Sequence, residues 1–135
     1  MKKVLLSIKP KYVKQILDGN KKWEFRKQIW NSEIDKILIY SSYPEKKFVA
    51  VFSPGKILFE EPHEIWNKCN TAAGLKQEEY FQYTEGRLAI FAIEITNLEV
   101  FKTPFRLPEF MGPQNFRYYD DNLFGGLKNF LPQIL

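Results

Sequence analysis

The sequence predicts an α+β fold in which a small, curved and mostly antiparallel sheet or β-barrel carries short helices packed at its ends. Its 135 residues suit one domain, and a share of 44% hydrophobic and 27% charged residues is that of an ordinary globular chain. Short strand patterns outnumber helical ones, which argues against parallel βαβ winding. No repeat or linker divides the chain, so we expect residues 1–135 to form a single domain.

The first two expected elements are a strand and a short helix. Residues 4–8 form a short apolar run that is typical of a strand. Pro10 fits the first turn of a helix, where its missing N–H leaves no hydrogen bond unmade. Gly19 is a natural left-handed helix stop, so we expect the helix over residues 10–18.

The next segment alternates with a period of two. Over residues 22–26 this pattern sends Trp23 and Phe25 to one face of a strand, expected to be the interior of the barrel. Glu24 and Arg26 then project from the opposite face. The segment is therefore predicted to be a half-buried strand with a charged outer face.

The remaining elements are short runs of either pattern. Further strands are expected at residues 37–40, 48–52, 56–59 and 87–101. Pro54 and Gly55 separate the second and third of these as a turn or a bulge. Short helices are expected at residues 62–68 and 76–83, and Pro113 can open a further helical turn that carries Phe116 and Tyr119.

The basic charge is concentrated near the N-terminus. Residues 1–50 hold 12 Lys and Arg against 5 Asp and Glu, a net charge of +7, whereas residues 51–135 hold 8 against 11, a net charge of −3. Such an asymmetry indicates an anionic partner, with nucleic acid the first candidate. Solubility is the alternative explanation for the same charge.

Cysteine and histidine usage excludes several kinds of site. Cys69 and His63 are each the single residue of their type, so the chain has neither an internal disulfide nor a Cys/His zinc site of ordinary ligand count. We expect no metal and no cofactor. The apolar runs are too short for a signal peptide or a membrane span, so we expect a cytoplasmic protein with no membrane partner.

Two short motifs resemble the opening of ASCH domains, which belong to the PUA-like superfamily with the EVE and YTH domains. The motifs are S-I-K-P at residues 7–10 and G-x-K-x-x-E-x-R at residues 19–26. Further matches similar to the family lie at residues 39–44, at 55–57 and 62–66, at Tyr83 with 86–87, and at 113–114 with 116–118. The resemblance implies a small PUA-like β-barrel with a cleft whose floor holds Lys21, Glu24 and Arg26.

The residues themselves allow such a site. Glu24 and Arg26 lie two positions apart on one strand, so their side chains leave the same face and can address one ligand. Lys21 follows the glycine stop and can reach over that ligand. Together the three groups supply donors for phosphate or base oxygens and an acceptor for an exocyclic amine. The alternative is that these charges are a solvated strand face with no ligand.

Aromatic residues and a strand end extend the candidate site. Bases stack on aromatic rings, and the turn at residues 40–43 lies where loops often carry function, so we expect it to form a wall of the cleft. Most of the other rings, including Trp23 and Trp66, are expected to be core. The candidate ligand-binding residues are Lys9, Lys21, Glu24, Arg26, Tyr40, Ser41, Ser42 and Tyr43.

Binding of RNA or of a modified nucleotide is the first of three functions that remain open. The second is enzymatic, because the resemblance includes amidohydrolases that act on acetylcytidine and members described as ribonucleases, with Lys21 and Glu24 as the catalytic residues here. Glu24 stands where those hydrolases carry Thr, and no acid lies near Ala73, where their second acid would be expected. The third is a protein-interaction module, since PUA-like folds do not determine a function.

Overall fold

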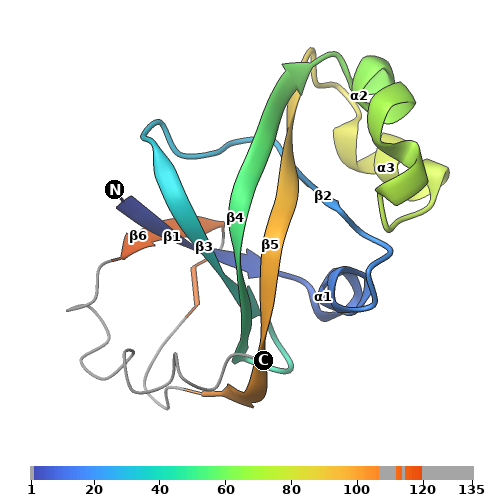
Figure 1. The fold of residues 1–135 in the computed structure, drawn as a ribbon. Helices are drawn as coiled ribbons and strands as arrows, with labels where there is room; N and C mark the ends of the chain where they lie inside the picture. Colours follow the sequence, from blue (N-terminus) through green and yellow to red (C-terminus); the bar gives the residue numbers. More distant parts are fainter. Residues whose placement is uncertain (1, 107–111, 114, 120–135) are drawn as a thin grey trace.

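A mixed six-stranded sheet with three short helices forms the protein in the computed structural model, which describes residues 2–106, 112–113 and 115–119. The strand order is β2-β5-β4-β3-β1-β6 (Figure 1). The elements are β1 (Lys2–Ile8), α1 (Pro10–Leu17), β2 (Trp23–Arg26), β3 (Ile34–Ser41), β4 (Lys47–Glu60), α2 (Pro62–Cys69), the 3-10 turn η1 (Asn70–Ala72), α3 (Gln77–Thr84), β5 (Ile90–Phe105) and β6 (Phe116–Tyr119). The predicted α+β class is confirmed.

The sheet is mostly antiparallel, as predicted, with one exception. β1 and β3 pair in parallel, with Ile8 opposite Ser41 at one end of the ladder. The expectation that parallel winding is absent is therefore wrong for this pair. α1 and β2 lie between the two strands in the chain and carry it back to the end where β1 began, so β3 runs in the same direction as β1.

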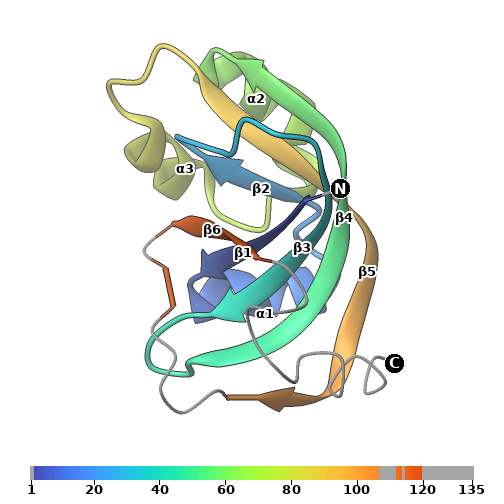
Figure 2. The same ribbon diagram turned by 90° about the vertical axis from the view of Figure 1, so that its left-hand side faces the viewer.

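The predicted barrel is not closed by backbone hydrogen bonds within the described residues. β2 and β6 form the two edges of the sheet, and Figure 2 shows how strongly the sheet curves between them. Register shifts in the β4–β5 ladder supply this curvature, because bulges increase local twist. One shift lies between Pro54 and Ile57, so these residues form a bulge inside one long strand, the second of the two alternatives that the sequence left open.

Curvature brings the edge strand β2 back toward β1. The Arg26 guanidinium crosses the remaining seam, since its Nη1 donates to the Ser7 backbone carbonyl at 3.2 Å. Its Nη2 donates to the side-chain oxygen of Asn115, just before β6. A side chain therefore links the two ends of the sheet where a closed barrel would have a backbone ladder.

The predicted helical turn after Pro113 is instead strand β6. It pairs antiparallel with β1, and Phe116 lies opposite Leu6. Phe116 packs edge-on against Trp30, with ring centroids 5.7 Å apart. The otherwise unpaired edge of β1 offers backbone partners that a single helical turn would not have, which explains why the strand forms.

Three apolar clusters fill the interior. The largest joins β1, α1, β3 and β4, and a second lies between β3, β4 and the distal half of β5. The third packs Phe25 of β2 against α2 and α3, where Tyr80 is fully buried and meets Phe25 edge-on at 5.1 Å. Trp66 packs against Tyr80 within this cluster, with ring centroids 4.7 Å apart, as expected for a core residue.

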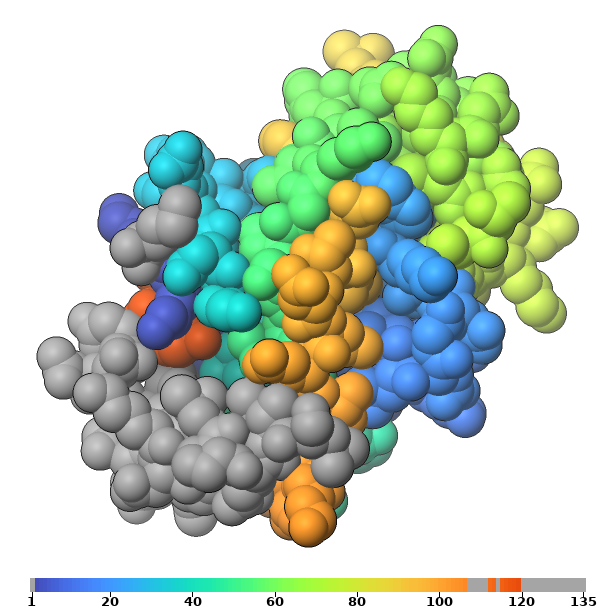
Figure 3. All heavy atoms as spheres, viewed as in Figure 1, coloured from blue at the N-terminus to red at the C-terminus, as the bar shows by residue number. Residues whose placement is uncertain are grey.

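The helices lie at the ends of the sheet, as predicted. Figure 1 shows α2 and α3 beside the ends of β4 and β5, with α1 apart from them beneath β2. The faces of β4 and β5 that are turned toward the viewer in Figure 3 form open surface beside α2. None of the helices in the described part of the chain is long and apolar enough to cross a membrane.

Candidate functional site

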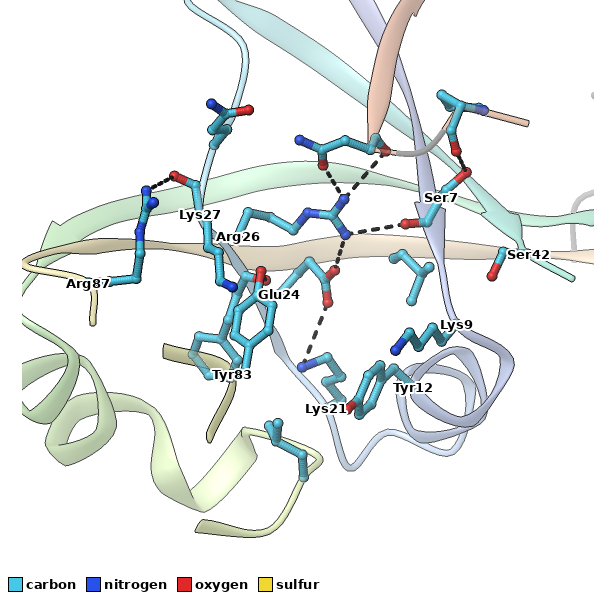
Figure 4. A pocket seen from close by; sticks show the side chains of 16 residues that line it. Ser7, Lys9, Tyr12, Lys21, Glu24, Arg26, Lys27, Ser42, Tyr83 and Arg87 are labelled. Carbon is cyan, nitrogen blue, oxygen red and sulfur yellow. Dashed lines mark hydrogen bonds and ion pairs between the residues drawn. The ribbon is translucent and has the colours of Figure 1, made fainter. Parts of the chain in front are cut away.

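A cavity of about 630 Å³ lies at the seam between β2, α1 and the segment that precedes β6. This volume is within the range of small-molecule and cofactor pockets, roughly 300–1,000 Å³. Five basic side chains and one acidic side chain line it, as Figure 4 shows. These charged lining residues are Lys9, Lys21, Glu24, Arg26, Lys27 and Arg87.

Lys21 lies at the floor of the cavity and is 3% exposed. Its backbone forms an isolated antiparallel bridge with Ala73, which anchors the segment after α1 against the turn before α3. The Lys21 Nζ donates to the Ala73 carbonyl at 2.9 Å and lies 3.7 Å from Glu24 Oε1. The hydrogen bond to Ala73 uses one of the three donors of the amine, and the contact with Glu24 is an ion pair rather than a hydrogen bond.

Glu24 lies between two cations and is 5% exposed. Its Oε2 accepts from Arg26 Nη1 at 2.9 Å, while its Oε1 faces Lys21. The contact between Glu24 and Arg26 confirms that both project from the same face of β2. Both Lys21 and Glu24 are buried, so the charges at this part of the site are not solvated.

The Arg26 guanidinium is largely occupied by the protein itself. It contacts Glu24, the Ser7 carbonyl and both oxygens of Asn115. Such a residue orients the carboxylate beside it and has few donors left for a ligand. The geometry thus separates the motif into a positioning residue, Arg26, and two groups at the cavity floor, Lys21 and Glu24.

Burial lowers the pKa of the Lys21 amine below its ordinary value, and the negative charge of Glu24 opposes this effect only in part. At a given pH, a larger fraction of this amine is consequently neutral than in an exposed lysine. A neutral amine is a base or a nucleophile, whereas the charged form is a hydrogen-bond donor to an anion.

Tyr12 lines the same cavity from α1 and was not singled out from the sequence. Its hydroxyl donates to Glu79 Oε2 on α3, and Lys11 contacts the same carboxylate oxygen. Burial and the bond to Glu79 raise the pKa of Tyr12. The Lys21 Nζ lies 5.6 Å from the Tyr12 ring centroid. Glu79 follows the expected position near Ala73 by six residues, but its direct partners are Tyr12 and Lys11.

The structure separates the residues predicted to form a wall at the turn 40–43. Ser42 lines the cavity, whereas Tyr40, Ser41 and Tyr43 are not among its lining residues. Tyr40 packs in the core edge-on against Phe48, and Ser41 is buried. Tyr43 points away and is 77% exposed. Core packing of β3 decides this division, which strand-end position alone does not reveal.

Lys27 and Arg87 are the charged lining residues that sequence reasoning missed. Lys27 follows β2 directly, and its Nζ lies 4.6 Å from the ring centroid of Tyr83, another lining residue. Arg87 donates from Nη2 to the Lys27 carbonyl at 3.2 Å. The similarity of residues 83–87 to the ASCH family was a signal for this segment, but it assigned no role to its side chains.

The described residues include no cluster of three or more His, Cys, Asp or Glu side chains suited to a metal ion. The charged groups of the cavity are mainly ammonium and guanidinium groups, which are not metal ligands. These groups are positively charged hydrogen-bond donors, so the cavity suits an anion rather than a cation.

Gly74 determines how closely the backbone approaches Lys21, and its substitution is testable. It has a φ of +72°, and a Cβ added there would lie 2.3 Å from the Lys21 Cβ. Gly19 has a similar φ of +85° but no atom within 4 Å of an added Cβ. We expect Gly19→Ala to cost about 1–2 kcal/mol of unfolding free energy from left-handed strain alone. Gly74→Ala should cost at least about 1 kcal/mol more because of overpacking.

Urea denaturation of the two variants measures this difference. Equal losses of unfolding free energy for Gly19→Ala and Gly74→Ala would show that the structure accommodates the added Cβ next to Lys21 without cost. The close approach of Gly74 to Lys21 would then not require glycine.

Comparison with known proteins decides the family. A family model of the ASCH domain matches residues 6–105. The chain belongs to the ASCH domain family. The match covers the motif residues Lys21, Glu24 and Arg26 and the missed residues Lys27 and Arg87.

Known relatives of this ASCH domain occur in proteins of different kinds. It is 28% identical over 86 residues to an "ASCH domain-containing ribonuclease" of Zymomonas mobilis, covering 63% of this chain and 58% of that protein. It is 25% identical over 119 residues to an "ATP synthase subunit alpha" and to a "Large ribosomal subunit protein uL22" of Ureaplasma parvum. These alignments cover 85% of this chain but span only 15% and 38% of the respective Ureaplasma proteins.

Solved structures show the same fold. The crystal structure of ASCH from Zymomonas mobilis matches this ASCH domain with a TM-score of 0.84 and 20% sequence identity, over 98% of this chain and 96% of that chain. A mutant of the same Zymomonas protein matches with a TM-score of 0.85 over the whole of both chains.

Proposed function

We propose that this ASCH domain binds RNA or a modified nucleotide in the cavity at the seam of its sheet. The observation that carries the proposal is the buried carboxylate of Glu24, which lies beside the Lys21 amine on the floor of a cavity with five basic side chains. Glu24 can accept from an exocyclic amine of a base, and Lys21 has a donor left for a base oxygen. The name of the Zymomonas relative supports an RNA-related role.

Aromatic rings flank this floor. Tyr12 and Tyr83 both line the cavity and lie on opposite sides of Glu24 in Figure 4. An unpaired base can stack on such rings, whereas a base inside a duplex cannot reach them, so the proposed ligand is single-stranded. We propose that it is bound in the cytoplasm. This sequence has one cysteine and therefore no internal disulfide, which is typical of cytosolic proteins.

A second candidate is enzymatic, and the lowered pKa of Lys21 favours it. A neutral amine at the cavity floor could act as a general base on a ribose hydroxyl, which would cleave RNA, or as a nucleophile on an amide such as that of acetylcytidine. The ribonuclease name of the Zymomonas relative favours the first of these reactions over the second.

Binding of a labelled single-stranded RNA tests the proposed function. We expect the dissociation constant to rise with salt and to rise about tenfold in Lys21→Met, because a charge-assisted hydrogen bond is lost. Lys22→Met is the matched control, since Lys22 is the adjacent exposed lysine and does not line the cavity. Mass analysis of the same mixtures reports whether the RNA is cleaved, and a parallel incubation with acetylcytidine reports whether acetate is released. Equal RNA affinity in wild type and Lys21→Met would contradict this site.

A further inference from the structure

Exposed cations bound the mouth of the cavity on two sides. Lys27 and Arg87 lie on one side of Glu24 and Lys9 lies on the other, as Figure 4 shows. The three residues come from separate segments: Lys9 is the N-cap of α1, Lys27 follows β2 and Arg87 precedes β5. All three are exposed at the surface while they line the cavity.

Within the part of the chain that the structure describes, no carboxylate forms an ion pair with these three cations. Among the described residues, the ion pairs of exposed lysines are those of Lys11, Lys14 and Lys68, and none involves the three cations at the mouth. Lys27 and Arg87 are nonetheless held beside each other, through the Tyr83 ring and the Lys27 carbonyl. Two sides of the mouth therefore present positive charge to whatever enters.

The floor between these two sides differs from them because it also carries a negative charge. Glu24 pairs with both Lys21 and Arg26, so its one negative charge offsets part of their positive charge, and the floor carries the groups that suit a base edge. A ligand that matches the whole cavity thus has a neutral, hydrogen-bonding part in the middle and a negative group on each side. A free nucleoside has no such negative groups, whereas a nucleotide inside a strand has a phosphate on both its 5′ and its 3′ oxygen.

We propose that the cavity takes one nucleotide of a single strand together with both of its flanking phosphates, one bound by Lys27 and Arg87 and the other by Lys9. This inference rests on the proposed function, since it assumes that the base enters the cavity. It specifies which nucleosides and nucleotides bind best, namely those that carry a phosphate on both the 3′ and the 5′ oxygen.

Calorimetric titration with minimal ligands tests it. The probes are the four ordinary ribonucleosides, their 5′-monophosphates, their 3′-monophosphates and their 3′,5′-bisphosphates. We expect the bisphosphate of the preferred base to bind most tightly, with each phosphate lowering the dissociation constant about tenfold, as expected for charge-assisted contacts.

Variants of the cations at the mouth test which of them binds which phosphate. The double variant Lys27→Ala/Arg87→Ala should abolish the gain in affinity from one phosphate and keep the gain from the other. Lys9→Ala should abolish the gain that the double variant keeps. In each variant, the gain from a phosphate is measured relative to the affinity of that same variant for the nucleoside. Lys22→Ala/Lys56→Ala is the control for net charge, because both lysines are exposed and neither lines the cavity.

The outcomes separate this inference from the proposed function. If the nucleoside binds as tightly as the bisphosphate, the phosphate contacts are wrong while the base pocket stands. If one monophosphate binds as tightly as the bisphosphate, or both variants abolish the same gain, the mouth has a single phosphate site and the two-sided arrangement is wrong. If none of the probes binds while the labelled single-stranded RNA does, this inference is wrong and the proposed function stands; if the RNA does not bind either, both fail.

Discussion

Glu24→Ala is expected to lower the free energy of unfolding by about 3–5 kcal/mol, the largest loss of any single change at the cavity. The carboxylate is 5% exposed and lies 2.9 Å from Arg26 Nη1 and 3.7 Å from Lys21 Nζ. Its removal leaves two cations close together in a buried place with no negative charge between them. Urea denaturation at neutral pH measures the loss.

Two further variants show whether charge is the cause. Glu24→Gln keeps the shape of the side chain and an acceptor oxygen, so it should lose less stability than Glu24→Ala. The double variant Lys21→Met/Glu24→Ala should recover part of the loss, because one uncompensated cation is then absent. A loss below about 1 kcal/mol in Glu24→Ala would mean that water solvates this group and that the carboxylate does not organise the site.

Lys21→Met is expected to reduce any RNA-cleaving activity by about 100-fold to 10,000-fold, the usual contribution of a general base. The Lys21 Nζ is the titratable group at the cavity floor whose pKa burial lowers, so it is the group best suited to exchange a proton with a bound ligand. Initial rates on a single-stranded RNA measure the effect, with Lys22→Met as the control for charge.

The pH profile of cleavage distinguishes a base from a structural lysine. Because the pKa of Lys21 is lowered from 10.5, its neutral form becomes populated at a lower pH than in an exposed lysine. The rate should therefore rise with pH and level off below pH 10.5. If Lys21→Met retains the wild-type rate, or if the rate falls over that interval, Lys21 is not the base and the binding function stands alone.

Short-range pattern accounts for the elements that surround the site. The alternation at residues 22–26 predicted that Glu24 and Arg26 share a face, and their 2.9 Å contact follows from the two-residue period of a strand. Pro10 and Gly19 predicted a helix close to Pro10–Leu17. These features depend on neighbours in the chain, so they can be inferred without knowledge of the fold.

The turn at residues 40–43 and β6 could not be inferred in the same way. Tyr40 looked like a pocket wall because it ends a strand, but packing against Phe48 directs it into the core. Phe116 and Tyr119 were expected in a helical turn opened by Pro113, but the edge of β1 provides backbone hydrogen-bond partners for a strand. In both cases a partner distant in sequence outweighed the local pattern.

The amino-acid sequence alone determined the fold class, the basic N-terminal third and the motif residues Lys21, Glu24 and Arg26. Only the tertiary structure decided that Lys21 and Glu24 are buried, that Arg26 bridges the seam to Ser7 and Asn115, and that further cations complete the mouth. The physical reason is the curvature of the sheet, which brings its two edges together. The burial of Lys21 and Glu24 and the grouping of charges around the cavity depend on those long-range contacts.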